Sequence, residues 1–243
     1  RKDTARALEI AETAVKEFPK ESGSWFFRGQ ILIALGRIDR AVGDFDRTLA
    51  LDPLHLFAWH ERGAAHFRLG RFGLAIKDWN EVIRLDPSRE PYHWQRGIAF
   101  YYAGRFEEGR KQFLLHQKVN PRDVENAVFH FICNARAKGL ERARMELIPI
   151  TGDERVPMAE IHQLFQGKLD ADAVLAAARK GDPGSQKRHE FYARYYVGLY
   201  FDSIGDAVRA REHIFAAEKL ADTAGYMGDC ARVHASLLRV KGE

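Results

Sequence analysis

The fold is decided by the stretch SWFFRGQILIALGRIDRAVGDFDRTLALDP (residues 24–53) and by two stretches that repeat its pattern, AWHERGAAHFRLGRFGLAIKDWNEVIRLDP (58–87) and YHWQRGIAFYYAGRFEEGRKQFLLHQKVNP (92–121). A tryptophan or histidine, two glycines, a small residue, an aromatic residue and a proline recur in this order every 34 residues. That period predicts two antiparallel helices per repeat. The recurring positions are Trp25, Trp59 and His93; Gly29, Gly63 and Gly97; Gly36, Gly70 and Gly104; Ala41, Ala75 and Gly109; Phe45, Trp79 and Phe113; and Pro53, Pro87 and Pro121.

The small residues have distinct roles in this pattern. A glycine inside a helix costs about 0.5–1 kcal/mol relative to alanine. The first glycine of each repeat therefore predicts close approach by a neighbouring helix. The second glycine lies where the first helix should stop, in a left-handed C′ position. The proline then ends the second helix. Because a single repeat cannot bury its apolar face alone, stacking of repeats must supply the core.

Composition narrows the class of protein. The chain has 243 residues, of which 46% are hydrophobic and 30% charged, which is typical of a globular or solenoid protein. The net charge is +4, but the acids are interspersed with the bases, so nucleic-acid binding is not expected. No apolar run is long enough to span a membrane. The first residues do not form a signal peptide. The location of the protein in the cell stays open: the cell envelope if a leader was trimmed, and the cytoplasm otherwise. Cys133 and Cys230 are expected to be buried free thiols rather than a disulfide.

The pattern divides the chain into segments of different regularity. An N-terminal helix with a half repeat comes first, and a loosened repeat, an insert and a returning repeat follow the regular part. The boundaries are 1–21 for the N-terminal helix; 22–55, 56–89 and 90–123 for three repeats; 124–148 for a degenerate repeat; 149–186 for a non-repeat insert; and 187–243 for a C-terminal repeat with a capping helix.

The recurring residues carry a resemblance to the tetratricopeptide repeat (TPR) family. The resemblance implies an all-α solenoid of helical hairpins, wound as a right-handed superhelix, that binds other proteins. The order of segments is also similar to that of NlpI-type bacterial envelope lipoproteins, on the strings NAVFHFICNARAKGLERAR (126–144) and FYARYYVGLYFDSIGDAVRAREHI (191–214). That second resemblance implies a homodimeric adaptor that brings a protease to its substrate, without catalysis of its own.

In the TPR family, the first helices of the repeats line a concave groove. By that analogy the groove should be aromatic and apolar here, and should take an apolar peptide or a partner's helix. Alternatively, the chain's own C-terminal helices or a second copy cover these residues. The Lys/Asn clamp that some TPR domains use for a C-terminal carboxylate is absent. The expected lining is Phe26, Gln30, Phe57, His60, Phe67, Trp94, Ile98, Tyr101 and Tyr102.

Three arginines precede the first glycines at one repeat position and offer possible ionic contacts. Arg28, Arg62 and Arg96 could together grip an acidic ligand. The favoured interpretation is that each pairs inside the solenoid, for example with Asp44 and Asp78 on the second helices.

No catalytic constellation is visible, and no metal-ligand spacing or cofactor motif is present. His130 and Cys133 lie three residues apart on one expected helix, but a packed cysteine beside a histidine is favoured over a base–thiol pair. The sequence thus predicts a non-enzymatic scaffold or adaptor that binds protein or peptide partners. The alternatives are an enzyme or enzyme subunit that uses the insert 149–186, and a purely structural dimerisation module.

Overall fold

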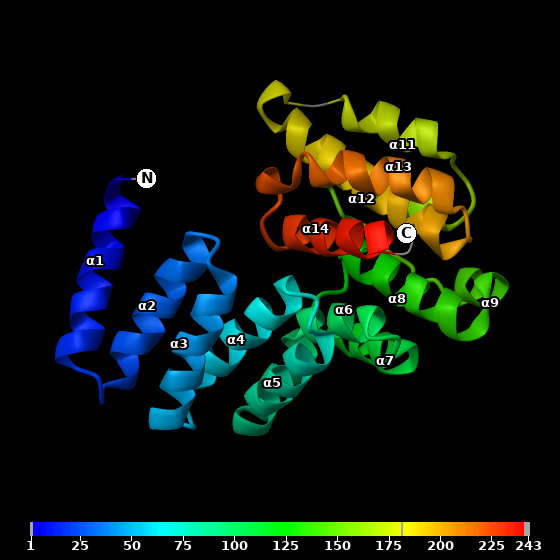
Figure 1. Cartoon of the computed structure of the whole chain (residues 1–243). Coiled ribbons are helices and arrows are strands. Elements are labelled where there is room, and N and C mark those ends of the chain that lie inside the picture. Colours follow the sequence, from blue (N-terminus) through cyan, green and yellow to red (C-terminus); the bar gives the residue numbers. More distant parts are fainter. Residues whose placement is uncertain (1, 181, 241–243) are drawn as a thin grey trace. The chain divides into compact units, whose positions relative to one another are not determined.

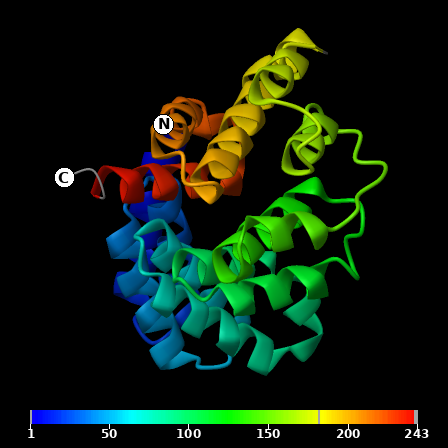
Figure 2. The same ribbon diagram turned by 90° about the vertical axis from the view of Figure 1, so that its right-hand side faces the viewer.

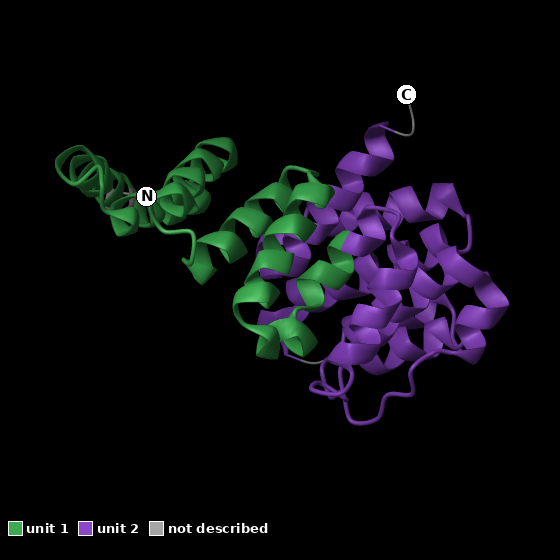
Figure 3. Cartoon of the chain, turned by 90° about the horizontal axis from the view of Figure 1, so that it is seen from below, with its two compact units in different colours: residues 1–99 green, residues 100–243 purple. Residues whose placement is uncertain are grey.

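The computed structural model describes residues 2–180 and 182–240, and these ranges form helices with no β-strand. Residues 1, 181 and 241–243, which belong to the predicted N-terminal helix, insert and capping segment, lie outside the described residues. The chain divides into two compact units, residues 1–99 (unit 1) and 100–243 (unit 2) (Figure 3). The division falls inside the predicted third repeat, 90–123. In the described ranges, no helix is both long and apolar enough to cross a membrane.

In unit 1, each helix between residues 2 and 85 packs against the next (Figure 1). Contacts between a second helix and the first helix of the following repeat confirm the predicted stacking over residues 2–68. The elements are α1 (Lys2–Glu17), α2 (Ser22–Ala34), α3 (Ile38–Leu51), α4 (Leu56–Arg68), α5 (Phe72–Leu85), the 3-10 helix η1 (Pro87–Tyr92) and the first part of α6 (Trp94–Tyr102).

The turn inside each repeat follows from its glycine. Gly36 has φ +71°, a backbone conformation that glycine adopts without strain. The N–H of Arg37 then donates to the carbonyl oxygen of Leu32 at 2.8 Å, which closes the end of α2. At the first glycine, a Cβ built on Gly29 would lie 2.6 Å from Phe45, so the predicted close approach of the paired helix is confirmed.

Unit 2 is organised around α8 (Val124–Lys138), whose side chains are buried along most of its length. The helix contacts α7, α9, α10 and α12 (Figure 2). The other elements of the unit are α7 (Phe106–His116), α9 (Leu140–Met145), α10 (Met158–Phe165), α11 (Ala171–Ala178), η2 (Pro183–Ser185), α12 (Gln186–Ser203), α13 (Ala207–Glu218), η3 (Ala221–Thr223) and α14 (Gly225–Val240).

The insert contains a loop and two short helices. Residues 147–154 are irregular, and α10 and α11 follow. Before the insert, α9 ends at Met145, and Pro149 disfavours helical backbone at Ile148, so the helix does not resume there. Sequence reasoning also missed η1, where Asp86 accepts a hydrogen bond from the N–H of Ser88 and a 3-10 helix begins.

Candidate protein-binding surface

Buried carboxylates of unit 1 hold the first two arginines of the repeats. Arg28 donates from Nε and Nη2 to the two oxygens of Asp44, at 2.8 and 2.6 Å. Arg62 does the same to Asp78, at 2.9 and 2.7 Å, and adds a bond to Asp46 at 2.6 Å. Bidentate pairing of this kind fixes the relative orientation of the two side chains in addition to pairing their charges. The favoured interpretation, pairing inside the solenoid, is confirmed for both arginines.

Arg96 has other partners, because the third repeat has no acid at the position of Asp44 and Asp78. Gln112 stands 34 residues after Asp78. Arg96 donates instead to Asn80 at 2.9 Å and to Glu90, on η1, at 3.0 Å. All three predicted ionic contacts are therefore already engaged within unit 1, and their guanidinium groups need no acidic ligand.

Five of the predicted lining residues in unit 1 keep contact with solvent. Gln30 is exposed and Phe57 is 60% exposed, while Phe26, His60 and Trp94 are partly buried. Phe57 belongs to the first turn of α4 and Trp94 begins α6. The first helices of unit 1 thus present aromatic side chains at their surface, as the groove prediction requires. Whether these residues bind a ligand remains a proposal.

Two other predicted lining residues of unit 1 belong to the core, which corrects the groove prediction. Phe67 has no exposed surface, and its ring centroid lies 5.7 Å from that of Phe72 and 6.3 Å from that of Trp79. Ile98 is 1% exposed. Burying an apolar side chain of this size stabilises the fold by about 1.5–3 kcal/mol, so these residues serve packing.

The two predicted lining residues of unit 2 are covered by its own C-terminal helices. The hydroxyl of Tyr101 donates to Asp202 on α12 at 3.1 Å. The hydroxyl of Tyr102 lies 3.4 Å from that of Tyr195 and 3.1 Å from Nδ1 of His234 on α14. Burial raises the pKa of both tyrosines well above the ordinary value. For this pair the prediction of open lining was wrong, and the alternative of intramolecular cover is confirmed.

Unit 2 also contains a pocket that sequence reasoning did not find. Its volume is about 440 Å³, and its lining comes from the loop 147–154, the start of α8 and α10 with the residues after it. Concave sites of this size accept small ligands or a peptide side chain. The wall consists of Val124, Ile150, Gly152, Asp153, Ala159, His162, Gln163, Gln166 and Lys168.

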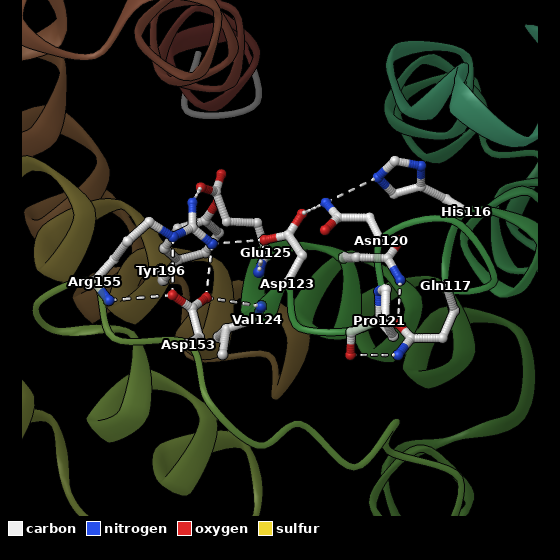
Figure 4. A network of polar contacts seen from close by, with 11 residues as sticks. His116, Gln117, Asn120, Pro121, Asp123, Val124, Glu125, Asp153, Arg155 and Tyr196 are labelled. Carbon is white, nitrogen blue, oxygen red and sulfur yellow. Dashed lines mark hydrogen bonds and ion pairs between the residues drawn. The ribbon is translucent and has the colours of Figure 1, made fainter.

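One arginine ties the loop beside this pocket to α8 (Figure 4). Arg155 donates from Nη2 to Asp123 and to Asp153, at 2.7 Å each, and from Nη1 to Glu125 at 2.6 Å. The other oxygen of Glu125 accepts the hydroxyl of Tyr196 at 2.6 Å. A single guanidinium therefore binds three carboxylates, which places an excess of negative charge around it.

Burial and neighbouring groups shift the pKa values of two carboxylates in this network. Burial, followed by the charge of Asp123, raises the pKa of Glu125. Burial acts in the same direction on Asp153, but hydrogen bonds from Arg155 and from the N–H of Val124 outweigh it, and the pKa of Asp153 is lowered. The carboxylate that lines the pocket is thus held ionised and paired, which suits a structural clamp better than a general base.

Two histidines of unit 2, His162 and His130, do not have the environment of a catalytic base. His162 donates from Nε2 to the carbonyl oxygen of Ile148 at 2.9 Å, and its Nδ1 accepts from Gln166 at 3.2 Å. His130 is 1% exposed, and burial lowers its pKa to about 4. Burial raises the pKa of Cys133. A base–thiol pair is therefore disfavoured, and the predicted buried free thiols are confirmed for both cysteines.

Comparison with known proteins identifies the repeat. Residues 1–55 and 28–90 match the family model of the tetratricopeptide repeat. A crystal structure of a tetratricopeptide repeat protein from Parabacteroides merdae, 15% identical, aligns over 98% of this chain and 93% of its own with a TM-score of 0.61.

Residues 1–90 contain tetratricopeptide repeats.

Two further TPR-like structures share this fold at low identity. MamA from Desulfovibrio magneticus RS-1, 18% identical, covers 69% of this chain and 88% of its own with a TM-score of 0.55. YrrB, described as a TPR protein with an unusual peptide-binding site, is 15% identical, covers 90% and 96%, and has a TM-score of 0.50. No curated protein matches the sequence. These likenesses show the TPR fold alone.

The TPR turn continues past the residues that the family model matches. Gly104 and Gly205 have φ of +74° and +84°, as Gly36 does in the first repeat. A Cβ on Gly198 would lie 2.7 Å from Ile214, which repeats the close helix contact of a TPR pair. Unit 2 therefore contains TPR-like hairpins, while the resemblance of the layout to NlpI-type lipoproteins remains a prediction.

Proposed function

We propose that the protein is a non-enzymatic scaffold that binds a partner protein or peptide through the first helices of unit 1. The observation that carries the proposal is Phe57, a large aromatic side chain left 60% exposed at the start of α4. Burying such a side chain on binding would yield about 1.5–3 kcal/mol. Aromatic residues are also enriched among those that dominate binding energy.

The surroundings of Phe57 define the kind of ligand. Arg89 lies with its guanidinium carbon 5.9 Å from the ring centroid of Phe57. Partly buried Phe26, His60 and Trp94 belong to the same set of first helices. The pairs Arg28–Asp44 and Arg62–Asp78 join α2 to α3 and α4 to α5, so these two first helices are held in place before a ligand arrives. An apolar or aromatic peptide, or one face of a partner's helix, suits this surface best. The description of YrrB as a peptide-binding TPR protein supports the same class of ligand.

The test is capture of partners from the native source by wild type and by the variant Phe57→Ala with Trp94→Ala. Leu74→Ala is the matched control, because Leu74 is an exposed apolar residue on a second helix of unit 1. Circular dichroism and a thermal midpoint establish that each variant is folded. We expect partner recovery to fall with the double variant and to be unchanged with the control. Equal recovery by all three proteins would remove the first-helix surface as the binding site.

A more specific role follows from the arrangement of segments. We propose that the scaffold acts as a protease adaptor in the bacterial envelope and forms a homodimer, as the resemblance to NlpI-type lipoproteins implies. Mass spectrometry of the captured proteins tests the adaptor role, because an envelope protease or peptidoglycan hydrolase should come down with wild type and not with the double variant. Sedimentation tests the dimer, and a monomer at micromolar concentration would contradict it.

The pocket of unit 2 is the observation that favours the alternative of an enzyme. Asp153 and His162 both line it. Each is already held by hydrogen bonds inside the unit, so no reactive group is assigned to it. A hydrolase screen of wild type against Asp153→Asn tests this alternative, which requires an activity that the substitution abolishes.

A further inference from the structure

The hairpin of α12 and α13 lacks an acid that the first two repeats have. In those repeats, Asp44 and Asp78 stand 15 residues after the first glycine, and each accepts two hydrogen bonds from an arginine of the paired helix. Counted in the same way from Gly198, the position of the acid is taken by His213 on α13. This hairpin therefore has no carboxylate of its own at that place.

An arginine is present in the hairpin, but at a different position. Arg194 stands four residues before Gly198, which is the position of Trp25 and Trp59. Each tryptophan donates its indole N–H to the carbonyl oxygen of the proline six residues before it, at 3.0 and 2.9 Å. Six residues before Arg194 is Arg188, which lies inside α12, so its carbonyl oxygen is used by the helix. The usual partner of this position is therefore missing.

The guanidinium of Arg194 is short of hydrogen bonds. Its Nε is buried and has no hydrogen-bond partner among the described residues, although Oε1 of Glu190 lies 3.5 Å away. Its Nη1 lies 3.5 Å from Nδ1 of His213. Both distances exceed the range of about 2.7–3.2 Å that is usual for N–H donors. Burial, and then the charge of Arg194, lower the pKa of His213, so the histidine supplies a neutral ring and no counter-charge.

A cavity of about 90 Å³ lies beside this guanidinium, between the end of α11 and the first half of α12. Its volume is about that of three water molecules in the liquid, so it admits the head of a ligand and no larger group. One part of the wall is cationic and another part is apolar. The lining residues are Leu175, Ala178, Arg179, Gln186, Glu190 and Arg194.

We propose that this cavity binds a carboxylate carried on a short aliphatic arm, which supplies the acid that the hairpin lacks. The pairs of Asp44 and Asp78 show that arginines of this fold are held by carboxylates with bidentate geometry. The arm of the ligand would contact Leu175 and Ala178. A carboxylate of this kind occurs on an acidic side chain of a partner protein and on a free small carboxylic acid.

The charges of the lining fit a ligand with a single negative charge. Arg179 and Arg194 are opposed by Glu190 alone, which leaves an excess of one positive charge. The side chain of Glu190 is 52% exposed, so it can turn to solvent when the ligand arrives. The site belongs to unit 2 and uses no residue of the first-helix surface of unit 1. Either proposal can therefore fail alone.

The experiment follows NMR signals of the whole protein during titration with three probes. The signals are the Nε–Hε group of Arg194, assigned by its absence in Arg194→Gln, and the backbone amides of the cavity residues. The probes are sodium acetate, a blocked peptide with a single glutamate, and inorganic phosphate, each at an ionic strength held constant with sodium chloride. We expect a saturable shift with acetate, with the glutamate peptide or with both. The carboxylate that saturates at the lower concentration identifies the source as a free acid or a protein side chain.

Substitutions make the test specific to the cavity. Arg194→Gln should weaken binding of the carboxylate by about tenfold or more, because the charged donor is lost. His213→Asp should weaken it to a similar degree, because an internal carboxylate then pairs with Arg194. Glu190→Gln should tighten it by about two- to fivefold, because a competing surface charge is removed.

Arg188→Gln is the matched control, since Arg188 is exposed on α12 and does not line the cavity. It removes the same charge as Arg194→Gln and should leave the affinity unchanged. Circular dichroism establishes that each variant is folded, and if His213→Asp does not fold, the other two cavity variants decide the test. The proposal is overturned if neither carboxylate saturates, if phosphate alone does, or if Arg194→Gln binds as wild type does.

Discussion

Gly63 lies against the indole of Trp79, so closely that a Cβ built on the glycine would be 2.6 Å from the indole nitrogen. The indole is anchored, because its Nε1–H donates to the carbonyl oxygen of His60 at 3.2 Å. The ring is also fully buried. The aromatic residue of the second helix therefore occupies the space that the glycine of the first helix leaves open.

We predict that Gly63→Ala destabilises the protein, although alanine is the better helix former. The added methyl group must push a fixed ring, and overpacking of this kind costs about 1–3 kcal/mol. Gly43 is the matched control: it lies exposed inside α3, with no heavy atom within 4 Å of an added Cβ. Gly43→Ala should stabilise by about 0.5–1 kcal/mol. Urea unfolding measures both, and a stabilised Gly63→Ala would contradict the packing argument.

We predict that Arg62→Met lowers the free energy of unfolding by about 2–4 kcal/mol, because it leaves the buried carboxylate of Asp78 without its guanidinium partner and with only His66 at 3.9 Å. Asp78 is 2% exposed. In the double variant with Asp78→Asn, much of the loss should be recovered. Arg84→Ala is the control, since Arg84 pairs with Glu81 at the surface and should cost less than about 0.5 kcal/mol. Additive losses in the double-mutant cycle would show that the pair does not stabilise the fold.

We predict that His130 makes the protein sensitive to mild acid. Burial, and then the charge of Arg110, lower the pKa of His130 to about 4 from the ordinary 6.5. Between these values the unfolded chain binds a proton that the folded chain does not. The free energy of unfolding should therefore fall as the pH drops through this window, by about 2–3 kcal/mol in total.

The variant His130→Gln should show a flatter pH dependence between pH 6.5 and 4, whatever its stability at neutral pH. Urea unfolding at several pH values measures the slope. Above pH 7.5 the variant and wild type should have the same slope. A slope below pH 6.5 that is unchanged in the variant would assign the acid sensitivity to other groups.

We predict that Arg155→Gln destabilises the protein at neutral pH, because Asp123, Glu125 and Asp153 lose the cation that they share. The loss should shrink as the pH falls from 7 to 5. The pKa of Glu125 is already raised, so protonation of its carboxylate is the first step that relieves the repulsion. Arg209→Ala, which removes a surface pair with Asp206, is the control. A loss that does not vary with pH would exclude charge repulsion as its cause.

The repeats could be predicted because their determinants are local. Gly36 needs a positive φ and Gly29 needs a close neighbour, and both requirements recur at a fixed period that can be counted in the sequence. The pairing of Arg28 with Asp44 was also accessible, since it spans 16 residues within one helical hairpin. The start of α11 has a local determinant too, because the side chain of Asp170 accepts a hydrogen bond from the N–H of Ala173.

The surface could not be predicted because its exposure depends on distant contacts. Tyr102 meets His234, 132 residues later, and nothing in the spacing of either residue indicates this. Arg155 meets Glu125, 30 residues earlier, through a loop whose path has no periodic pattern. The repeat position of Phe67 resembles that of a groove residue, but the ring turns to Trp79. The positions taken from the family therefore predicted the helix face of a residue better than its exposure to solvent.

Arg62 also connects carboxylates of two successive second helices, Asp46 on α3 and Asp78 on α5. A solenoid whose units touch only their neighbours can fray one hairpin at a time. Here the loss of either hairpin would deprive the other of a charge partner. The interface between repeats therefore contributes more stabilisation relative to each repeat alone. The first two repeats should then melt as one cooperative block, and hydrogen exchange of their amides should report a single opening free energy.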